Sequence, residues 1–546
     1  MAGGLCRPSG FRRSTLLFAR EFCYSLREDH AHGLKFLGRH TGRKQTEKLL
    51  SAGAIEIDFS KYIASGLLKE ACPIKRVFVN QLAANSPVED RWNMGLTQVD
   101  GIVSSCLFTV LDGHSGTSCV HTLAWSILDY VAAAFLDTKK LHLAVEHWRT
   151  HDLEQPYHLA RRLDLLSSTD HRRLGHAASP PSAQMSAHMR RCLRDYVEDL
   201  VGRIDRSLDP VHCMTDALLR LDDDLCSVGK VIDLKLDADE LGNIHDPTVS
   251  RDLLRVALSG AVGVVGRIFW HNTEKSEGFP TELHLANVGD CGAVLLRQLD
   301  AFDTALTAIP CTKAHQGSSN PDELKRVALE HPENKPSELF REGGRLLGEL
   351  APCRAFGNVR YKWPVERSLE LSRVLGQLSS SKLDGLHMTC SPSGSDIFPL
   401  PHPYTSPPYL TAKPDVTCFE ITPADRYLVL ATDGLWDMLS LEDTTTVMEA
   451  ELRKPTAPAT RLLWRCLTCV PPAVARAISS ASPNPKTTRR GSPLKSPSDF
   501  EETDKRAFDR AFKLLSLPPG LARYYRDDIT VMVLELFNRT EDPVLE

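Results

Sequence analysis

The chain lacks any apolar run long enough to span a membrane. A transmembrane helix needs about 20 consecutive apolar residues, whereas the best stretch, residues 256–265, is ten residues long and lies between Arg255 and Arg267. We therefore expect this stretch to belong to a folded core. The chain also lacks a strong charge of one sign, because 65 Lys and Arg residues stand against 70 Asp and Glu residues. The resulting net charge of -5 argues against a general nucleic-acid or membrane-surface protein.

Paired cysteines are nearly absent. Of 15 cysteines, only Cys466 and Cys469 form a CxxC pair, without a second pair or histidines at zinc-finger spacing. A zinc site is therefore disfavoured, and scattered thiols are typical of a reducing compartment. The content of 42% hydrophobic and 25% charged residues is that of a soluble globular protein. A chain of 546 residues could hold two to four average domains, or one large enzyme domain with insertions.

Acidic residues are missing from the first 20 positions, which carry four arginines interleaved with Phe, Leu, Ser and Thr. This composition is typical of a mitochondrial transit peptide, and a disordered basic tail is the alternative. We predict a transit peptide and lead-in over residues 1–50 and a single domain over 76–540. Segments rich in His, Ser, Pro or basic residues predict flexible insertions near 146–190, 371–408 and 471–500.

The most informative stretch is Phe108–Gly116, where an apolar run leads into Asp112, Gly113 and His114. Residues 107–111 predict a buried strand that stops at Gly113, and the apolar period from residue 120 predicts a helix through residue 135. The aspartate offers the hard oxygen that Mg²⁺ or Mn²⁺ prefers, and the glycine lets a backbone carbonyl approach a cation. An ordinary Asp-Gly turn is the alternative interpretation.

Carboxylates recur at three further strand ends. Asp90 follows a Ser-Pro turn, Asp433 follows the apolar run 427–431, and Asp527 precedes the run 529–536. We expect the strands to bring these acids and Asp112 to one rim of a sheet, where ligation by oxygen alone suits two divalent ions. Two such ions would acidify a shared water and hold a phosphoryl group for direct hydrolysis, without a covalent enzyme intermediate.

Three further patterns predict local structure. Residues 283–287 and 293–296 read as the two strands of a hairpin around Val288–Gly292. The sequence Asn320-Pro-Asp-Glu predicts a capped helix that runs through residue 329. Residues 212–225 predict a helix whose acidic end, residues 222–224, is solvated.

Taken together, six segments resemble the motifs of the metal-dependent protein serine/threonine phosphatases of the type 2C class. The resemblance spans residues 80–537 and implies an α+β fold, a four-layer αββα sandwich of two antiparallel β-sheets flanked by helices, with a bimetal site at one end. The segments, in chain order, are Val88–Asp90, Val110–His114, Ala286–Asp290, Arg354–Gly357, Thr432–Asp437 and Arg526-Asp527.

The resemblance also implies roles for individual residues. Asp112 would bridge two Mg²⁺ or Mn²⁺ ions, and the Gly113 carbonyl and Asp90 would complete the coordination of one or other ion. Asp433 and Asp527 would hold the remaining one. His114 would protonate the departing serine oxygen, a task that suits an imidazole near neutral pH. A purely structural His114 is the alternative.

Three segments, residues 80–91, 354–363 and 404–414, resemble one branch of this class, the mitochondrial pyruvate dehydrogenase phosphatases. This likeness implies a location in the mitochondrial matrix and, as substrate, the phosphorylated E1 component of the pyruvate dehydrogenase complex. By likeness alone it adds the lipoyl domain of the E2 core and a regulatory subunit as partners, and a sensitivity to calcium. No nucleic acid and no transmembrane segment are expected.

Four positions depart from the wider class. Asn85 stands where many members have an arginine that holds the substrate phosphate, which makes Asn85 a candidate substrate-binding residue. Ala314 replaces an aspartate that holds a weak third metal, and Gly292 and Asn358 replace an arginine and an aspartate. These departures motivate a second hypothesis, a catalytically weak scaffold of the same fold. A third hypothesis keeps the enzyme and changes the phosphoprotein substrate.

Overall fold

The computed structural model describes residues 42–99, 102–150, 158–163, 181–227, 254–271, 281–300, 304–369, 371, 401, 404–469, 511–517 and 522–536. The predicted transit peptide up to residue 41 and the predicted insertion at 471–500 lie outside the described residues. So does most of the predicted insertion at 371–408.

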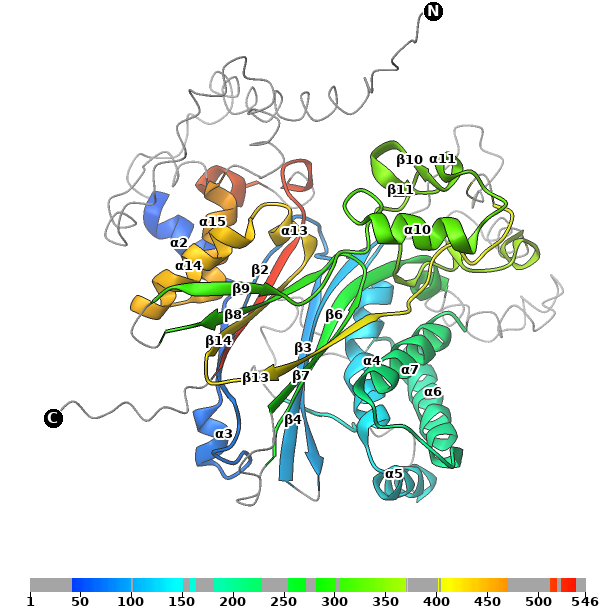
Figure 1. Ribbon diagram of the computed structural model, residues 1–546, viewed down its shortest axis with the longest axis horizontal. Helices are drawn as coiled ribbons and strands as arrows, with labels where there is room; N and C mark the ends of the chain where they lie inside the picture. Colours follow the sequence, from blue (N-terminus) through cyan, green and yellow to red (C-terminus); the bar gives the residue numbers. More distant parts are fainter. Residues whose placement is uncertain are drawn as a thin grey trace, which may run out of the picture.

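Two antiparallel sheets form the middle of the structure (Figure 1). In spatial order the first contains β1 (Ile55–Asp58), β2 (Ile74–Leu82), β15 (Ile529–Leu536), β14 (Asp425–Ala431), β8 (Gly292–Gln298) and β9 (Leu306–Pro310). The second contains β13 (Asp415–Ile421), β7 (Thr281–Val288), β6 (Gly260–Phe269), β4 (Ile102–His114), β3 (Arg91–Val99) and β5 (Arg161–Arg162), and β12 (Phe356–Gly357) pairs with β6. A small separate hairpin joins β10 (Phe340–Arg341) to β11 (Arg345–Leu346).

Helices cover the outer face of each sheet. On the β3–β4 sheet lie α4 (Ser118–Phe135), α6 (Ala183–Gly202) and α7 (Pro210–Leu225), with α5 (Thr138–Thr150) packed on α6. On the other sheet lie α14 (Leu441–Arg453) and α15 (Pro458–Thr468), with α2 (Gly42–Ser51) beside α15. Shorter helices include α3 (Ser60–Ala64), α10 (Pro321–Glu330), α11 (Pro336–Leu339), α13 (Asp433–Trp436) and the 3₁₀ turns η3 (Glu342–Gly344), η4 (Val359–Tyr361) and η7 (Ala522–Tyr524).

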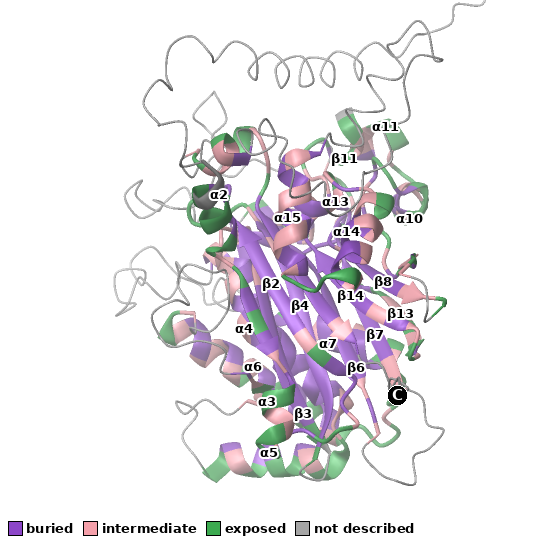
Figure 2. Ribbon diagram, turned by 90° about the vertical axis from the view of Figure 1, so that its left-hand side faces the viewer, coloured by how far each residue is buried: buried purple, intermediate pink, exposed green. Residues whose placement is uncertain are grey.

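Three hydrophobic layers hold these elements together, and the alternation of side chains along each strand explains them. In β4, Phe108 and Val110 point between the two sheets, whereas Leu107 and Leu111 point towards the helices. Both strand faces are therefore buried, as Figure 2 shows for the strands at the centre of each sheet. This arrangement is the predicted four-layer αββα sandwich, so the fold class is confirmed.

Among the described residues, α4 alone has the length and hydropathy that a membrane span requires. Most of this helix, 78%, is buried inside the protein. Its apolar character is accounted for by packing, because α4 lies between the β3–β4 sheet and α7.

Several boundary predictions hold. α4 begins two residues before the predicted stretch and ends at the predicted residue 135, and β15 covers the predicted 529–536. α10 ends at residue 330, one residue beyond the prediction, and its N-cap is Asn320, whose Oδ1 accepts from the Asp322 amide at 3.1 Å.

The predicted end of the opening strand was wrong. β4 continues through Gly113 to His114, because β6 pairs with it along this whole length, up to the pair His114 and Gly260. A glycine permits a turn but does not impose one when a neighbouring strand supplies the hydrogen bonds.

The predicted hairpin at residues 283–296 was also wrong. β7 pairs with β6 and β13, whereas β8 pairs with β14 and β9, so the two strands lie in different sheets. The corner between them includes Gly289, whose φ of 97° lies in the left-handed region. The sequence pattern identified both strands but carried no information on their pairing partners.

The acidic end of α7 is only partly solvated, because Asp223 is exposed as predicted but Asp222 and Asp224 are buried. Asp222 and Asp224 are 7% and 8% exposed, and each has a basic or hydroxyl partner from another part of the chain. Lys362 Nζ lies 2.6 Å from Asp222 Oδ2, and Tyr130 donates to Asp224 at 2.7 Å. These partners are remote in sequence, which explains why the local pattern suggested a solvent-exposed end.

Two predicted boundaries need correction at their edges. The folded part begins before residue 76, because β1 pairs with β2 and Phe59 is fully buried. The range predicted for the insertion, 146–190, is too wide. Residues 146–150 complete α5, and residues 183–190 lie in α6. Residues 151–157 and 164–180 within it lie outside the described residues.

Candidate active site

Asp112 lies at the centre of a group of carboxylates at one end of the sandwich. It occupies β4 opposite Val262 of β6 and is partly exposed. Its pKa is raised well above the usual value, first by burial and then by the negative charges of Asp90 and Asp433, with smaller effects from Asp290 and Asp527. The sequence prediction that Asp90, Asp433 and Asp527 gather around Asp112 therefore agrees with the structure.

Gly113 follows directly and has no room for a side chain. A Cβ at this position would lie 2.6 Å from Cγ1 of Val120 and 2.7 Å from the carbonyl oxygen of Glu89. Glu89 is itself fixed there, since its Oε1 accepts a hydrogen bond from the Gly116 amide at 2.9 Å. The glycine thus allows the Asp90 loop and the start of α4 to close around the end of β4.

Asp90 is fully buried, and only one of its two carboxylate oxygens has a partner. Oδ2 accepts from Thr530 Oγ1 at 2.7 Å and from Thr432 Oγ1 at 3.1 Å. Oδ1 is buried and has no hydrogen-bond partner among the described residues. The two threonines, which sequence reasoning missed, orient the carboxylate so that one oxygen remains free to bind a ligand.

Asp433 begins α13, immediately after β14. Its Oδ1 is likewise buried without a hydrogen-bond partner among the described residues. Burial and the charges of Asp290 and Asp437 raise its pKa well above the usual value. A strand followed at once by a helical turn therefore delivers this carboxylate to the same place as Asp112.

The Asp527-Asp528 pair at the start of β15 has two different roles. Asp527 is 46% exposed, and its Oδ1 lies 3.3 Å from Nη1 of Arg523. Asp528 is buried and accepts hydrogen bonds from the amides of Ala84, Asn85 and Glu89, the last two at 2.9 and 2.8 Å. Only Asp527 can therefore contribute to the set of carboxylates around Asp112. Asp528 instead fixes the loop that carries Asp90.

Asn85, the candidate substrate-binding residue, belongs to the same loop contact. Its side-chain Nδ2 donates to Asp528 Oδ2 at 2.9 Å, in addition to the backbone bond. The amide therefore has a structural partner at the base of the loop. Phosphate binding by Asn85 stays a prediction.

Asp290, at the end of β7, is an additional member of the group. Its Oδ2 accepts from Gln316 Nε2 at 2.5 Å, and its pKa is raised chiefly by burial. Burial and then the charge of Asp290 raise the pKa of Asp437, the C-cap residue of α13. The sequence motif contained Asp290, but the strand pattern gave no sign that it faces Asp112, because β7 was assigned to a hairpin.

These carboxylates fit divalent cations. Each raises the pKa of its neighbours, so the charged group needs positive charge nearby, and two buried oxygens lack partners. No three His, Cys, Asp or Glu side chains in the described part of the chain form a compact ligand set. Mg²⁺ does not require one, because it commonly binds through one or two carboxylates and keeps several waters.

Comparison with known proteins agrees with this chemistry. Residues 175–468 match the family model of protein phosphatase 2C. The chain is 31% identical to mitochondrial pyruvate dehydrogenase (acetyl-transferring) phosphatase 2 of Homo sapiens over 476 residues, which cover 83% of this chain and 76% of that protein. The chain belongs to the protein phosphatase 2C family. The predicted enzyme class, a metal-dependent serine/threonine protein phosphatase, is thereby confirmed.

Two further similar proteins share less sequence identity with the chain. Mitochondrial pyruvate dehydrogenase (acetyl-transferring) phosphatase 1 of Rattus norvegicus is 29% identical over 466 residues, covering 84% of this chain and 76% of that protein. A solved serine-threonine phosphatase 2C from Toxoplasma gondii has 13% identity and a TM-score of 0.38, covering 89% of this chain and 99% of that chain.

His114 ends β4 in this phosphatase 2C chain, two residues after Asp112. Its Nε2 lies 2.6 Å from Oδ1 of Asn358. An amide oxygen only accepts hydrogen bonds, so this contact assigns the proton to Nε2 of the neutral imidazole. Burial lowers the pKa of His114, and the hydrogen bond to Asn358 partly opposes that effect.

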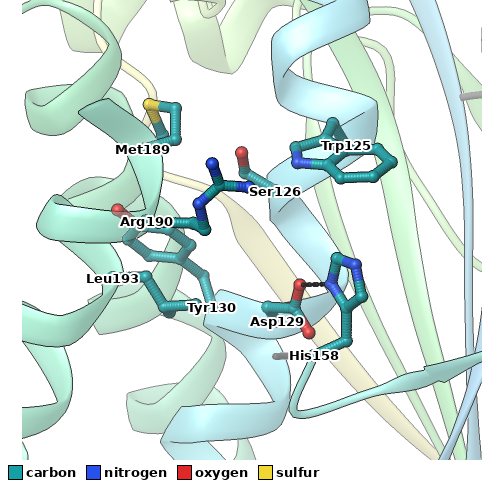
Figure 3. Close-up of a pocket in the computed structure, with 8 residues that line it drawn as sticks. All are labelled: Trp125, Ser126, Asp129, Tyr130, His158, Met189, Arg190 and Leu193. Atoms are coloured by element: carbon teal, nitrogen blue, oxygen red, sulfur yellow. Dashed lines mark hydrogen bonds and ion pairs between the residues drawn. The ribbon is translucent and has the colours of Figure 1, made fainter. Parts of the chain in front are cut away.

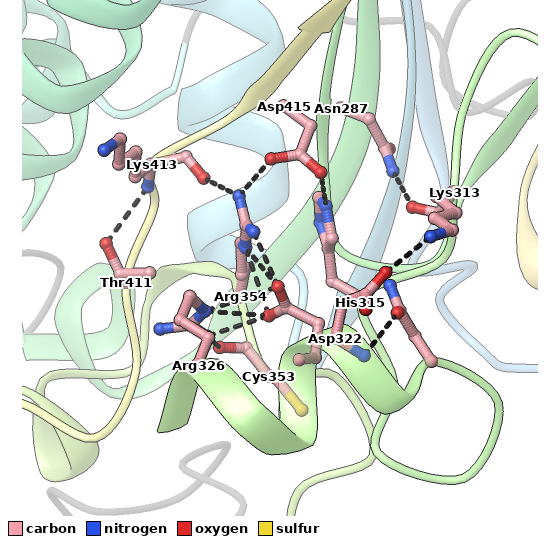
Figure 4. Close-up of polar contacts among 12 residues, drawn as sticks. Asn287, Lys313, His315, Asp322, Arg326, Cys353, Arg354, Thr411, Lys413 and Asp415 are labelled. Carbon is pink, nitrogen blue, oxygen red and sulfur yellow. Dashed lines mark hydrogen bonds and ion pairs between the residues drawn. The ribbon is translucent and has the colours of Figure 1, made fainter. Parts of the chain in front are cut away.

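The arginine of the phosphatase 2C motif at residues 354–357 makes its ion pairs outside the group of carboxylates around Asp112. Arg354 lies between Glu323 and Asp415, with Nη2–Oε1 and Nη1–Oδ1 distances of 2.6 and 2.7 Å. Figure 4 shows its contact with Asp415. Asp415 also lies 3.0 Å from Nε2 of His315, whose Nδ1 accepts from the Gly289 amide at 3.0 Å. Arg354 therefore braces the corner that carries Asp290.

Two of the departures from the phosphatase 2C motifs have a local explanation. A Cβ at Gly292 would lie 2.7 Å from Nε1 of Trp436, so no arginine fits under this ring. Trp436 Nε1 donates to the Ala431 carbonyl at 3.0 Å, which fixes the indole. At Ala314 the backbone carbonyl accepts from Asn320 Nδ2 at 3.0 Å, and no carboxylate is available from this position for a third metal.

A separate hollow lies between α4 and α6, away from the carboxylates (Figure 3). It encloses about 340 Å³, part of it open to solvent, and includes Trp125 and Arg190 in its lining. The Asp129 carboxylate in its wall accepts from the Ala160 amide at 3.0 Å and lies 2.8 Å from Nδ1 of His158. These contacts anchor residues 158–163 on α4, so this hollow is structurally distinct from the active site.

Proposed function

We propose that this phosphatase removes phosphate from serine on the E1 component of the mitochondrial pyruvate dehydrogenase complex, in the matrix, and so activates the complex. The proposal is supported by the two relatives at 31% and 29% identity, because both are mitochondrial pyruvate dehydrogenase phosphatases. The arginine-rich, acid-free start of the chain supports a mitochondrial location independently. Docking to an E2 lipoyl domain and to a regulatory subunit, and calcium sensitivity, rest on the family likeness alone.

We assign two Mg²⁺ or Mn²⁺ ions to the carboxylate group. The residues that would hold them are Asp112, Asp90, Asp433 and Asp527, together with the Gly113 carbonyl. The observation that carries this assignment is the pair of buried, unpartnered oxygens, Oδ1 of Asp90 and Oδ1 of Asp433. Ions bound there would supply Lewis-acid polarisation of a phosphoryl group and a more acidic water.

The protein's own part in the reaction is to orient groups and to move one proton. Thr432 and Thr530 hold Asp90 with one oxygen free. His114 is the group assigned to protonate the departing serine oxygen; because its Nε2 proton is directed to Asn358, the transferred proton would come from Nδ1 of the protonated ring. General acid catalysis of this type contributes about 10²–10⁴-fold.

The weak-scaffold alternative loses much of its motivation. Gly292 accommodates Trp436, and Asn358 is a hydrogen-bond partner of His114, so each of these residues has a defined role in this chain. The absence of a carboxylate at Ala314 bears only on a third ion. We therefore infer an active enzyme.

Phosphate release tests the proposal. Wild type and Asp433→Asn would be assayed on phosphorylated pyruvate dehydrogenase E1 and on a generic phosphoserine peptide, with Mn²⁺ or Mg²⁺ and then with EDTA. We expect metal-dependent release from E1 that the variant loses. Release from the peptide but not from E1 would retain the chemistry and reject the substrate. No phosphate release from either substrate would reject the enzyme in favour of the catalytically weak scaffold.

A further inference from the structure

Asn358 is held in a strained backbone conformation next to His114. Its φ and ψ are 52° and 48°, in the left-handed region that residues other than glycine adopt only at a cost. The residue is 3% exposed, and its side-chain Oδ1 lies 2.6 Å from Nε2 of His114. A strained buried residue whose side chain meets a candidate catalytic group is a reason to ask what the strain maintains.

The backbone around Asn358 is fixed on both sides. Its amide donates to the carbonyl of Ser259 at 3.0 Å, and its carbonyl accepts from the amide of Tyr361 at 3.0 Å. Ser259 precedes Gly260, and a Cβ at Gly260 would collide with both Asn358 Oδ1 and His114 Nε2. A glycine is therefore required at the point where the amide and the imidazole meet.

A buried ion pair holds this loop from the helical layer. Lys362 Nζ lies 2.6 and 2.8 Å from the two carboxylate oxygens of Asp222 and donates to the Ala355 carbonyl at 2.9 Å. Asp222 Oδ1 also accepts from the Gly357 amide at 2.8 Å. The end of α7 thus fixes both ends of the turn that presents Asn358.

We propose that Asn358 is a positioning residue for the phosphatase reaction, and that Asp222 and Lys362 act through it. The Asn358 side chain would fix the ring orientation of His114 for proton delivery to the departing serine oxygen. The inference rests on the proposed function, since it assigns His114 the role of general acid. The buried ion pair between α7 and the 355–362 loop would then support catalysis as well as the fold.

The leaving group of the substrate distinguishes positioning from a general structural role. A serine alkoxide needs a proton to depart, whereas p-nitrophenolate is a good leaving group without one. We expect Asn358→Ala to lower kcat on a phosphoserine peptide by about 10–100-fold, and by a much smaller factor on p-nitrophenyl phosphate. Asn358→Asp, which retains an acceptor oxygen at the same distance, should restore most of the loss.

Two comparisons sharpen this test. In a double-mutant cycle, Asn358→Ala should add little to the loss of activity already caused by His114→Ala, because both changes disrupt proton donation by the same pair of residues. Asn93→Ala is the matched structural control, since it removes another buried asparagine, whose Nδ2 donates to the Ala124 carbonyl at 2.8 Å. We expect the control to affect the two substrates by similar factors.

A measurement without turnover covers the case in which a variant is inactive. In the full chain labelled with ¹⁵N-histidine, the His114 ring should show a protonated Nε2 in wild type, and Asp222→Asn or Asn358→Ala should broaden or shift that signal. The proposal is overturned if Asn358→Ala lowers the activities on both substrates equally. It is also overturned if the losses of activity caused by Asn358→Ala and His114→Ala multiply in the double variant. Wild type without metal-dependent activity on either substrate would overturn the proposed function as well.

Discussion

Thr432 donates a hydrogen bond to Asp90 across 342 positions of sequence, from the end of β14 to the loop before β3, with an Oγ1–Oδ2 distance of 3.1 Å. The Thr432 hydroxyl also accepts from the amide of Thr530 at 3.0 Å, and Thr530 Oγ1 donates to the same Asp90 oxygen. One carboxylate is therefore oriented by two strands of the opposite sheet. This relationship links the packing of the sandwich to the geometry of the active site.

Replacing Thr530 with valine should weaken metal binding more than it weakens the fold. Valine keeps the shape of threonine but removes the shorter of the two hydrogen bonds to Asp90. Loss of a group that orients a ligand typically costs about 10–100-fold in metal affinity, and we expect about tenfold here. Mn²⁺ titration followed by calorimetry or by the activation constant would measure the effect.

Thr445→Val is a matched control for this change. Thr445 lies on the exposed side of α14 and donates only to the Leu441 carbonyl of its own helix. It should leave Mn²⁺ affinity unaltered. An affinity for Thr530→Val equal to that of wild type would show that Asp90 is not held by these hydroxyls or does not bind metal.

Metal removal should destabilise the protein in a pH-dependent way. Burial and mutual repulsion raise the pKa values of Asp90, Asp112 and Asp433. The native state therefore binds protons more tightly than the unfolded chain, so without metal its stability should fall as pH rises above about 4. We expect the melting temperature in EDTA to be higher at pH 5.5 than at pH 7.5, and metal to remove the difference.

Asp433→Asn should stabilise the protein when metal is absent. Removing one negative charge should raise the melting temperature in EDTA and reduce the increase caused by metal. For wild type, Mg²⁺ at about 100 times its dissociation constant should add about 2.7 kcal/mol of stability. A variant that melted below wild type in EDTA and retained the full metal response would contradict the assignment of Asp433 as a ligand.

Gly292 should not tolerate a side chain. A Cβ there would meet the indole of Trp436, so Gly292→Ala should cost about 1–3 kcal/mol through overpacking. Gly202→Ala is the control, because no atom lies within 4 Å of a Cβ built at that position. Urea unfolding of both variants would measure the difference, and equal stabilities would show that the Trp436 ring moves aside easily.

Much of the active site could be predicted because acids directly follow or precede apolar runs. Asp112, Asp433 and Asp527 lie where strands end or begin, and the apolar runs beside them correctly predicted buried strands. The threonines that hold Asp90 could not be predicted, since they become its neighbours only when β14 and β15 pair beside β2. The same limitation produced the false hairpin, because local patterns identify strands but not their partners.

Buried ion pairs were missed for a related reason. The acidic end of α7 looked solvent-exposed until Lys362, 140 positions later, was seen to pair with Asp222. Similarly, Glu323 looked only like the third residue of a capped helix. In the structure it is 3% exposed and bonded to both Arg354 and Arg326.

Glu323 should stabilise the protein in a specific acidic window. Burial alone opposes its charge, but hydrogen bonds from Arg354 and Arg326 outweigh that effect and lower its pKa to about 2 from the ordinary 4.5. A carboxylate with a depressed native pKa contributes its full stability above pH 4.5, and the contribution is lost as pH falls from 4.5 towards 2. We expect melting temperature to fall steeply across this window.

Glu323→Gln should reduce the pH dependence while lowering stability at neutral pH. Glutamine leaves the 9%-exposed Arg354 with one carboxylate, Asp415, and breaking a buried pair of this kind costs about 3 kcal/mol. Asp322→Asn, which alters the neighbouring exposed pair with Lys313, should change melting little at any pH. If Glu323→Gln lost stability between pH 4.5 and 2.5 as steeply as wild type, other carboxylates would govern acid unfolding, and the Arg354 cluster would not be the main source of acid sensitivity.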